Sequence, residues 1–367
     1  MNVRDDQPVA LPAPPSGRLR SLARRCLRCA WRRPGRTLLA LVMSVFVLAN
    51  VLAFIQAYSM THFVSGVSTT RPDQLSAMGK LGVILTGIRL GKPSNTISPA
   101  TMNLPYETHY YRGADGTEYE AWRVPAGGPP WRRWRGSRGV CLLFHGYAGC
   151  KASLLREAEV VRQAGYDAFL VDFRGSGGSS GTVTTVGYRE ADDVADAVNY
   201  VRQTFHPARV VIYGRSMGAA AALRAVALGK ARPDALVIES PFDRMFSTVA
   251  HRFDVVGVPK YPLAPLLVFW GGVQHGYWAF DHNPIDYARS VTCPTLMIRA
   301  GRDPFINRGE AESVFNNVAG PKQLLVVDGA AHEPCIGVDK GHWSRRVTDF
   351  LLAAPRETGG AVAHASH

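Results

Sequence analysis

The sequence predicts an α/β domain with a mainly parallel central sheet and helices on both faces, preceded by one membrane-spanning helix. Two observations predict the domain. Short β-branched apolar runs alternate with helical segments between residues 140 and 352, and one run ends in a Gly-x-Ser-x-Gly turn before an alanine-rich segment. The membrane helix is predicted by a stretch of 22 residues without a charge, Thr37–Tyr58.

The N-terminal segment carries much of the positive charge of the chain. Residues 1–36 hold nine arginines and two aspartates, a net charge of +7 out of the +13 of the whole chain. This composition, together with its prolines, predicts a disordered basic tail. Because the charge lies in a tail and not across a folded face, nucleic acid is not an expected partner.

Residues 37–58 are long enough to cross a bilayer. At about 1.5 Å rise per residue they span the ~30 Å hydrocarbon core. A buried core helix and a cleaved signal peptide are the alternatives, but a signal peptide has a shorter apolar region of about 7–15 residues. We therefore expect an uncleaved anchor in contact with membrane lipid. The arginines before it predict a cytoplasmic N-terminus, with the rest of the chain on the non-cytoplasmic (periplasmic or extracellular) side.

Residues 59–105 are expected to connect this anchor to the domain. Within them, apolar positions 81, 84, 85 and 88 share one helical face, which predicts a helix over Lys80–Leu90. Two strands are then predicted, Tyr106–Tyr111 and Thr117–Val124, joined by an Asp-Gly hairpin turn.

The domain is expected to cover residues 106–354, with residues 355–367 as a disordered polar tail. Parallel strands are predicted at 140–144, 168–172, 210–213, 235–238, 295–299 and 323–327. Helices are predicted at 153–164, 188–204, 217–228, 308–318 and 343–352. The alternation breaks at about 240–291, where aromatic residues and prolines predict an inserted helical cap over the carboxyl edge of the sheet.

The strand at 210–213 leads directly into Gly214-Arg215-Ser216-Met217-Gly218. A serine at a sharp turn between a buried strand and a helix has its Oγ exposed at the sheet edge, as in a nucleophile elbow. The two glycines suit the close approach of strand and helix. A βα turn with an incidental serine is the alternative interpretation.

A nucleophilic serine needs a base, and the base needs a group that fixes its tautomer. In a parallel sheet these partners come from loops at the same carboxyl edge. Asp303 follows the strand at 295–299 and His332 follows the strand at 323–327, so we expect His332 as base and Asp303 as acid. Asp243, just beyond the strand at 235–238, is the alternative acid.

The tetrahedral intermediate of such a reaction needs hydrogen-bond donors for its oxyanion. The strand at 140–144 ends in His145-Gly146-Tyr147, where a small residue lets the backbone turn into the site. We expect the backbone N–H groups of Tyr147 and Met217 to be these donors. His145 is expected to hydrogen-bond within its own loop, and Arg215 to bring positive charge near the cleft.

Taken together, the motifs resemble those of the α/β-hydrolase superfamily, in particular its membrane-anchored and secreted esterases, acylglycerol lipases and serine-aminopeptidase-like proteins. The matching motifs are His145-Gly146-Tyr147, Asp172-Phe173-Arg174-Gly175-Ser176-Gly177, Gly214-x-Ser216-x-Gly218, Gly301-Arg302-Asp303 and His332-Glu333. The resemblance implies a serine hydrolase that cleaves carboxylic esters of small-molecule acyl or lipid-like substrates through an acyl-enzyme on Ser216. It also implies that Asp172 and Arg174 brace loops beside the site.

Two other functions stay open from the sequence. Amide or peptide hydrolysis would use the same triad, and a hydrolase-like protein without activity would only bind. No cofactor and no metal are expected, because the sequence lacks metal-ligand spacings, a dinucleotide fingerprint and a P-loop. Cys150 and Cys335 follow loops at the same sheet edge, so oxidising conditions would allow them to form a disulfide.

Overall fold

The computed structural model of the chain describes residues 34–69, 76–127 and 136–353. Its centre is an eight-stranded sheet in the order β1-β2-β4-β3-β5-β6-β7-β8. The strands are β1 (Glu107–Arg112), β2 (Glu118–Val124), β3 (Val140–Phe144), β4 (Asp167–Val171), β5 (Val210–Arg215), β6 (Ala235–Glu239), β7 (Thr295–Ala300) and β8 (Lys322–Val327). The pairs β1–β2 and β2–β4 are antiparallel and the other neighbours are parallel, which confirms the predicted mainly parallel sheet.

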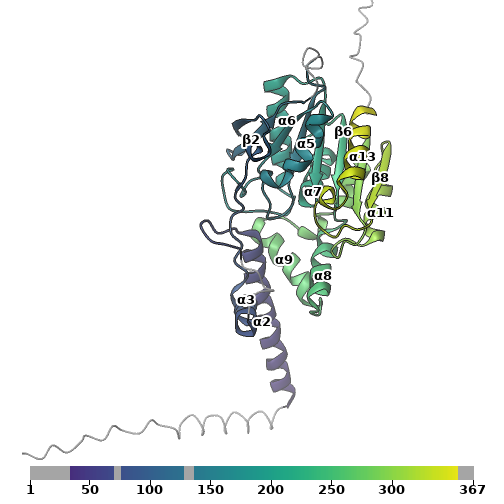
Figure 1. Cartoon of the computed structure of the whole chain (residues 1–367). Coiled ribbons are helices and arrows are strands. Elements are labelled where there is room, and N and C mark those ends of the chain that lie inside the picture. The colour runs from purple at the N-terminus through teal and green to yellow at the C-terminus, as the bar shows by residue number, and fades with distance from the viewer. Residues whose placement is uncertain (1–33, 70–75, 128–135, 354–367) are drawn as a thin grey trace, which may run out of the picture. The chain divides into compact units, whose positions relative to one another are not determined.

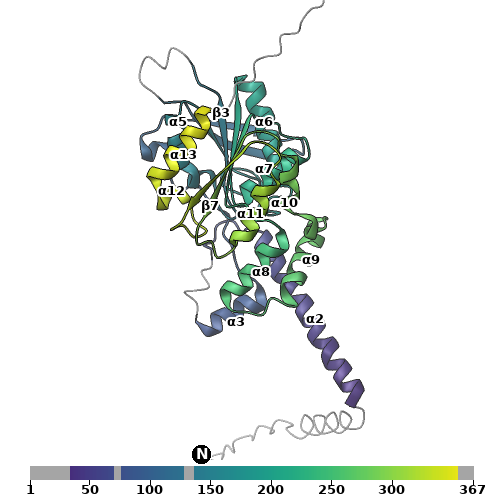
Figure 2. The ribbon, with the colours of Figure 1, turned by 90° about the vertical axis from the view of Figure 1, so that its right-hand side faces the viewer.

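Helices cover both faces of this sheet (Figures 1 and 2). One face carries α6 (Glu190–Phe205), α7 (Met217–Ala227) and α11 (Arg308–Asn317), and the other carries α5 (Leu155–Gln163) and α13 (Lys340–Ala353). Strand side chains alternate between the two faces, so β5 sends Ile212 into one buried apolar cluster and Val211 and Tyr213 into the other. The predicted α/β fold is thus confirmed.

The segment between β6 and β7 is largely helical. It contains α8 (Met245–Val256), α9 (Leu263–His275), η4 (Ala279–Asp281), α10 (Pro284–Tyr287) and η5 (Ala288–Ser290). Each of the two longer helices ends at a glycine in the left-handed region, Gly257 at φ 71° and Gly276 at φ 70°. Glycine adopts this conformation without a steric penalty, which explains why both helices end there.

An apolar helix, α2 (Pro34–Thr61), contains the whole predicted span 37–58. Its length and composition are sufficient to cross a membrane. Pro34, Gly35 and Arg36, expected in the basic tail, belong to this helix instead, and proline suits a first helical turn, where the N–H has no partner within the helix. The rest of the predicted N-terminal tail, and the C-terminal tail from 355, lie outside the described residues.

A short helix, α3 (Ala77–Thr86), lies in the connector, several residues before the predicted 80–90. Its start is set by Ser76, whose side chain accepts a hydrogen bond from the Gly79 N–H. It ends at Gly87, whose φ of 85° departs from helical geometry. The side-chain amide of Gln56 donates to the Val83 and Ile84 carbonyls at 2.7 and 2.9 Å, so α3 packs against the last turns of α2. Two short 3-10 helices, η2 (Pro99–Met102) and η3 (Lys151–Leu154), and the single turn α12 (Cys335–Val338) complete the described elements.

Candidate active site

Ser216 occupies the sharp turn between β5 and α7. Its backbone has φ 52° and ψ −114°, a strained conformation for a residue with a side chain. The Ser216 N–H donates to the Glu239 carbonyl on β6 at 2.7 Å. A Cβ on Gly214 would lie 2.5 Å from the Gly218 carbonyl oxygen, and one on Gly218 would lie 2.5 Å from the Phe144 carbonyl oxygen. The turn therefore needs glycine at both positions.

His332 and Asp303 lie in line with this serine. The Ser216 Oγ is 2.9 Å from His332 Nε2, and His332 Nδ1 is 2.7 Å from Asp303 Oδ2. The other Asp303 oxygen accepts the N–H groups of Phe305 and Ile306 at 2.9 and 3.1 Å. A carboxylate held in this way fixes the proton on Nδ1, which leaves Nε2 as the acceptor for the serine hydroxyl.

Asp243, the alternative acid, faces a different partner. Its carboxylate accepts the Arg244 N–H at 2.6 Å and the Arg244 guanidinium at 3.0 Å.

Both ring nitrogens of His145 form hydrogen bonds with backbone groups beside the site. Its Nδ1 donates to the Gly146 carbonyl at 2.8 Å, its Nε2 accepts the Phe173 N–H at 3.2 Å, and burial lowers its pKa. The geometry therefore brings together Ser216, His332 and Asp303.

The two residues expected to supply oxyanion donors flank the serine. Met217 is the first residue of α7, where N–H groups have no acceptor within the helix. Tyr147 follows Gly146, at which a Cβ would lie 3.5 Å from the Ser216 Cβ. Both Tyr147 and Ser216 line one cleft.

The chain leaving α2 contacts this region, which the sequence does not signal. The Tyr147 hydroxyl donates to the Met60 carbonyl in a short hydrogen bond, and the Phe63 ring lies 6.2 Å from the Tyr147 ring. Thr184 links the end of α2 to Met217, the second residue expected to supply an oxyanion donor. Its N–H donates to the Thr61 carbonyl at 2.9 Å, and its hydroxyl lies 3.5 Å from the Met217 sulfur.

The cleft beside Ser216 has a volume of about 180 Å³. It is lined by Gly146, Tyr147, Arg215, Ser216, Ser240, Arg252, His332, Glu333 and Pro334. Arg215 brings positive charge to the cleft, and its Nη1 is 3.9 Å from an oxygen of the buried Glu157. Desolvation raises the pKa of Glu157 to about 7, and Arg215 opposes that rise. Arg252, from α8, is a lining residue that the sequence does not signal.

Glu239 supports the site from beneath. Its fully buried carboxylate accepts the Tyr213 hydroxyl at 3.0 Å, the Cys335 N–H at 2.9 Å and the Trp343 indole N–H at 2.9 Å. One residue thus joins β5 and β6 to the segment that follows His332. In the sequence Glu239 only follows the strand predicted at 235–238, and nothing there signals this role.

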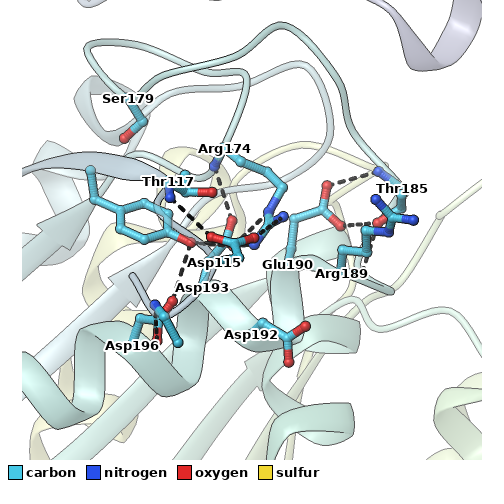
Figure 3. Close-up of polar contacts among 12 residues, drawn as sticks. Asp115, Thr117, Arg174, Ser179, Thr185, Arg189, Glu190, Asp192, Asp193 and Asp196 are labelled. Carbon is cyan, nitrogen blue, oxygen red and sulfur yellow. Dashed lines mark hydrogen bonds and ion pairs between the residues drawn. The ribbon is translucent and has the colours of Figure 1, made fainter. Parts of the chain in front are cut away.

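Asp172 and Arg174 brace the neighbouring loops, the role that the resemblance implied. Asp172 is fully buried against Lys151 and also accepts the Gly178 N–H at 2.9 Å. Arg174 pairs with the buried Asp193 and reaches Asp115 at 3.0 Å. Figure 3 shows this network of carboxylates around Arg174, next to the one in which Glu190 binds Thr185. None of these side chains lines the cleft.

The disulfide that oxidising conditions would allow is not formed, and Cys150 and Cys335 are both free and buried. The Cys150 thiol donates to the Ser94 carbonyl at 3.3 Å, and Cys335 begins the turn that Glu239 holds through the Cys335 N–H. Loops at one sheet edge do not by themselves bring two thiols together. Burial raises the pKa of both thiols, which keeps them protonated and unreactive.

Comparison with known proteins agrees with this geometry. The family described as serine aminopeptidase, S33, matches residues 135–259. The protein YqkD of Bacillus subtilis is 26% identical over 213 residues, covering 57% of this chain and 70% of that protein. The lysophosphatidylserine lipase ABHD12 of Xenopus tropicalis is 27% identical over 197 residues, covering 51% of this chain and 48% of the lipase.

Among solved structures, the esterase Pf2001 of Pyrococcus furiosus has a TM-score of 0.58 at 22% identity, covering 72% of this chain and 97% of the esterase. The fold and the family match together define the class of protein. The chain has the α/β-hydrolase fold, and the family match together with the esterase and the lipase supports a hydrolase of that superfamily.

The close approach of α7 to the end of β3 predicts that a methyl group added at Gly218 lowers the stability of the fold. Gly218→Ala is expected to destabilise the folded chain by about 1–3 kcal/mol, because the new Cβ meets backbone oxygens that cannot move aside. The matched control is Gly271→Ala on α9, where nothing lies within 4 Å of the added Cβ. Denaturant unfolding in detergent measures both variants. Equal stability of the two would contradict the packing described for the turn.

Proposed function

We propose that this protein is a serine hydrolase that cleaves carboxylic esters through an acyl-enzyme on Ser216. The observation that carries the proposal is the continuous hydrogen-bonded line from Ser216 Oγ through His332 to Asp303, which opens into the cleft. A line of this kind lets a neutral imidazole take the serine proton as the oxygen attacks.

Each step of the proposed ester hydrolysis can then be assigned to a residue of the site. The Ser216 oxygen attacks the ester carbonyl while His332 Nε2 accepts its proton, and Asp303 stabilises the imidazolium that forms. The N–H groups of Tyr147 and Met217 receive the oxyanion of the tetrahedral intermediate. His332 then gives its proton to the leaving alcohol, and the acyl group stays on Ser216. Water, deprotonated by the same histidine, hydrolyses the acyl-enzyme and restores the serine.

The charge of the cleft supports ester over aminopeptidase chemistry, the alternative that the family description favours. An aminopeptidase has to bind a substrate ammonium group, for which carboxylates are suited. The cleft lining instead contributes two arginines, Arg215 and Arg252, and one exposed carboxylate, Glu333. The esterase and the lipase among the similar proteins support the same reaction and an acyl or lipid-like substrate.

We also propose that α2 anchors the protein in a membrane, with the hydrolase domain on the non-cytoplasmic side. The uncharged span 37–58 and the arginines that precede it support this orientation. Protease is added to cells whose cell wall or outer membrane has been made permeable while the membrane that holds α2 stays intact. Under these conditions the protease is expected to digest the hydrolase domain. Digestion only after the anchoring membrane itself is broken would contradict the orientation.

Replacing the nucleophile tests the reaction itself. Ser216→Ala is expected to abolish hydrolysis of p-nitrophenyl esters and covalent labelling by a fluorophosphonate, because the attacking oxygen is gone. Turnover of aminoacyl p-nitroanilides by the wild-type protein measures the amidase alternative in parallel. A wild type that is not labelled, or equal labelling of wild type and Ser216→Ala, would leave only a non-catalytic binding role.

The choice of acid is tested by a pair of isosteric changes. Asp303→Asn is expected to lower kcat by about 10³–10⁴, because an amide no longer holds the proton on His332 Nδ1. Asp243→Asn is expected to change kcat by less than about threefold, since its carboxylate faces Arg244. Steady-state ester hydrolysis measures both, and the reverse order of effects would move the acid to Asp243.

A further inference from the structure

Arg252 lines the same cleft as Ser216 and His332, and the ester mechanism gives it no role. Its Nη1 donates to the carbonyl and the hydroxyl of Thr248, one turn earlier on α8, at 2.9 and 2.8 Å. Its Cζ lies 5.0 Å from the centre of the Phe305 ring, which packs edge-on against the His332 ring at 5.4 Å. These contacts hold the guanidinium one aromatic ring away from the proposed base.

The cation has no acidic partner among the described residues. Asp303 is the acid whose charge acts on it, but the Asp303 oxygens already accept from His332 and from two backbone N–H groups. The other acids packed near α8 have other partners. Glu310 accepts the Asn307 N–H at 3.0 Å and lies 3.5 Å from His251, and Asp243 pairs with Arg244 at 3.0 Å.

The remaining charges of the cleft do not replace such a partner. Arg215 is a second cation, but it is directed at the buried Glu157. Glu333 is exposed, and its carboxylate accepts the Ala331 N–H at 3.4 Å. Burial lowers the pKa of the Arg252 guanidinium, as expected for a desolvated cation that lacks a bound anion.

We propose that Arg252 binds a negatively charged group of the substrate, a carboxylate or a phosphate, so that acidic acyl esters are the preferred substrates. The bonds from Nη1 to Thr248 leave the Nε and Nη2 donors as a planar fork, which matches the paired oxygens of either anion. The proposal rests on ester hydrolysis at Ser216 and adds the class of ester.

Two pairs of ester substrates distinguish a carboxylate on the acyl group from a phosphate on the leaving group. In the first pair, p-nitrophenyl butyrate is neutral and mono-p-nitrophenyl glutarate carries a carboxylate on its acyl group. In the second, monooleoylglycerol is neutral and its phosphate ester carries the charge on the leaving group. The full-length wild type in detergent is expected to have the higher kcat/KM for the acidic member of at least one pair.

Arg252→Gln is expected to lower the acidic-to-neutral ratio of kcat/KM by about 10- to 100-fold in the preferred pair, since charge-assisted hydrogen bonds are lost. Loss confined to the first pair assigns a carboxylate on the acyl group, and loss confined to the second assigns a phosphate headgroup. Arg252→Lys, which retains the charge without the fork, is expected to give an intermediate ratio. The control is Arg244→Gln, which removes a half-exposed arginine at the start of the same helix and should leave the ratio unchanged.

Two results would overturn the proposal. The first is an unchanged acidic-to-neutral ratio in Arg252→Gln, whether or not both activities fall equally, and the second is a wild type that prefers the neutral member of both pairs. Failure of the proposed function itself gives a different result. In that case the wild type hydrolyses none of the four esters.

Discussion

The strained backbone at Ser216 is the constraint on which the rest of the site depends. A residue with a side chain holds φ 52° here only because its surroundings leave no alternative. Gly214 and Gly218 allow α7 to approach the sheet, and the Glu239 carbonyl accepts the Ser216 N–H. The Glu239 carboxylate also binds Trp343 and the Cys335 backbone, in the segment after His332. One buried residue therefore helps to position Ser216, the proposed nucleophile, and the loop of His332, its proposed base.

A second set of contacts joins the site to the chain that leaves the apolar helix. Tyr147 reaches the Met60 carbonyl, and Thr184 links Thr61 to the Met217 side chain. Both residues with proposed oxyanion donors thus touch the last turn of α2 directly or through one side chain. A displacement of this helix end would therefore act on Tyr147 and Met217, the two residues whose N–H groups are proposed to receive the oxyanion.

The features that could be predicted from the sequence are those with a local sequence pattern or a fixed order along the chain. Buried parallel strands are nearly continuous apolar runs, so β3 to β7 are recognisable without knowledge of their neighbours. Ser216, Asp303 and His332 each follow a predicted strand, and parallel topology brings strand ends to one edge.

The parts that could not be predicted depend on long-range packing or on side-chain direction. Tyr147 and Met60 are 87 residues apart and no motif links them. Arg252 lies on a helix where an arginine would ordinarily face water, and only the fold turns it into the cleft. For a related reason, the sequence left open whether Cys150 and Cys335 pair, because neighbouring loops do not determine where a thiol points.

The most direct test of the central claim is to observe the acyl-enzyme. Rapid mixing of the full-length protein with an excess of p-nitrophenyl butyrate should release a burst of about one equivalent of p-nitrophenol per site before steady turnover. Acid quenching followed by mass spectrometry of the digested protein should find the butyryl group on the peptide that contains Ser216. Steady ester hydrolysis with the acyl group on another residue would contradict the account.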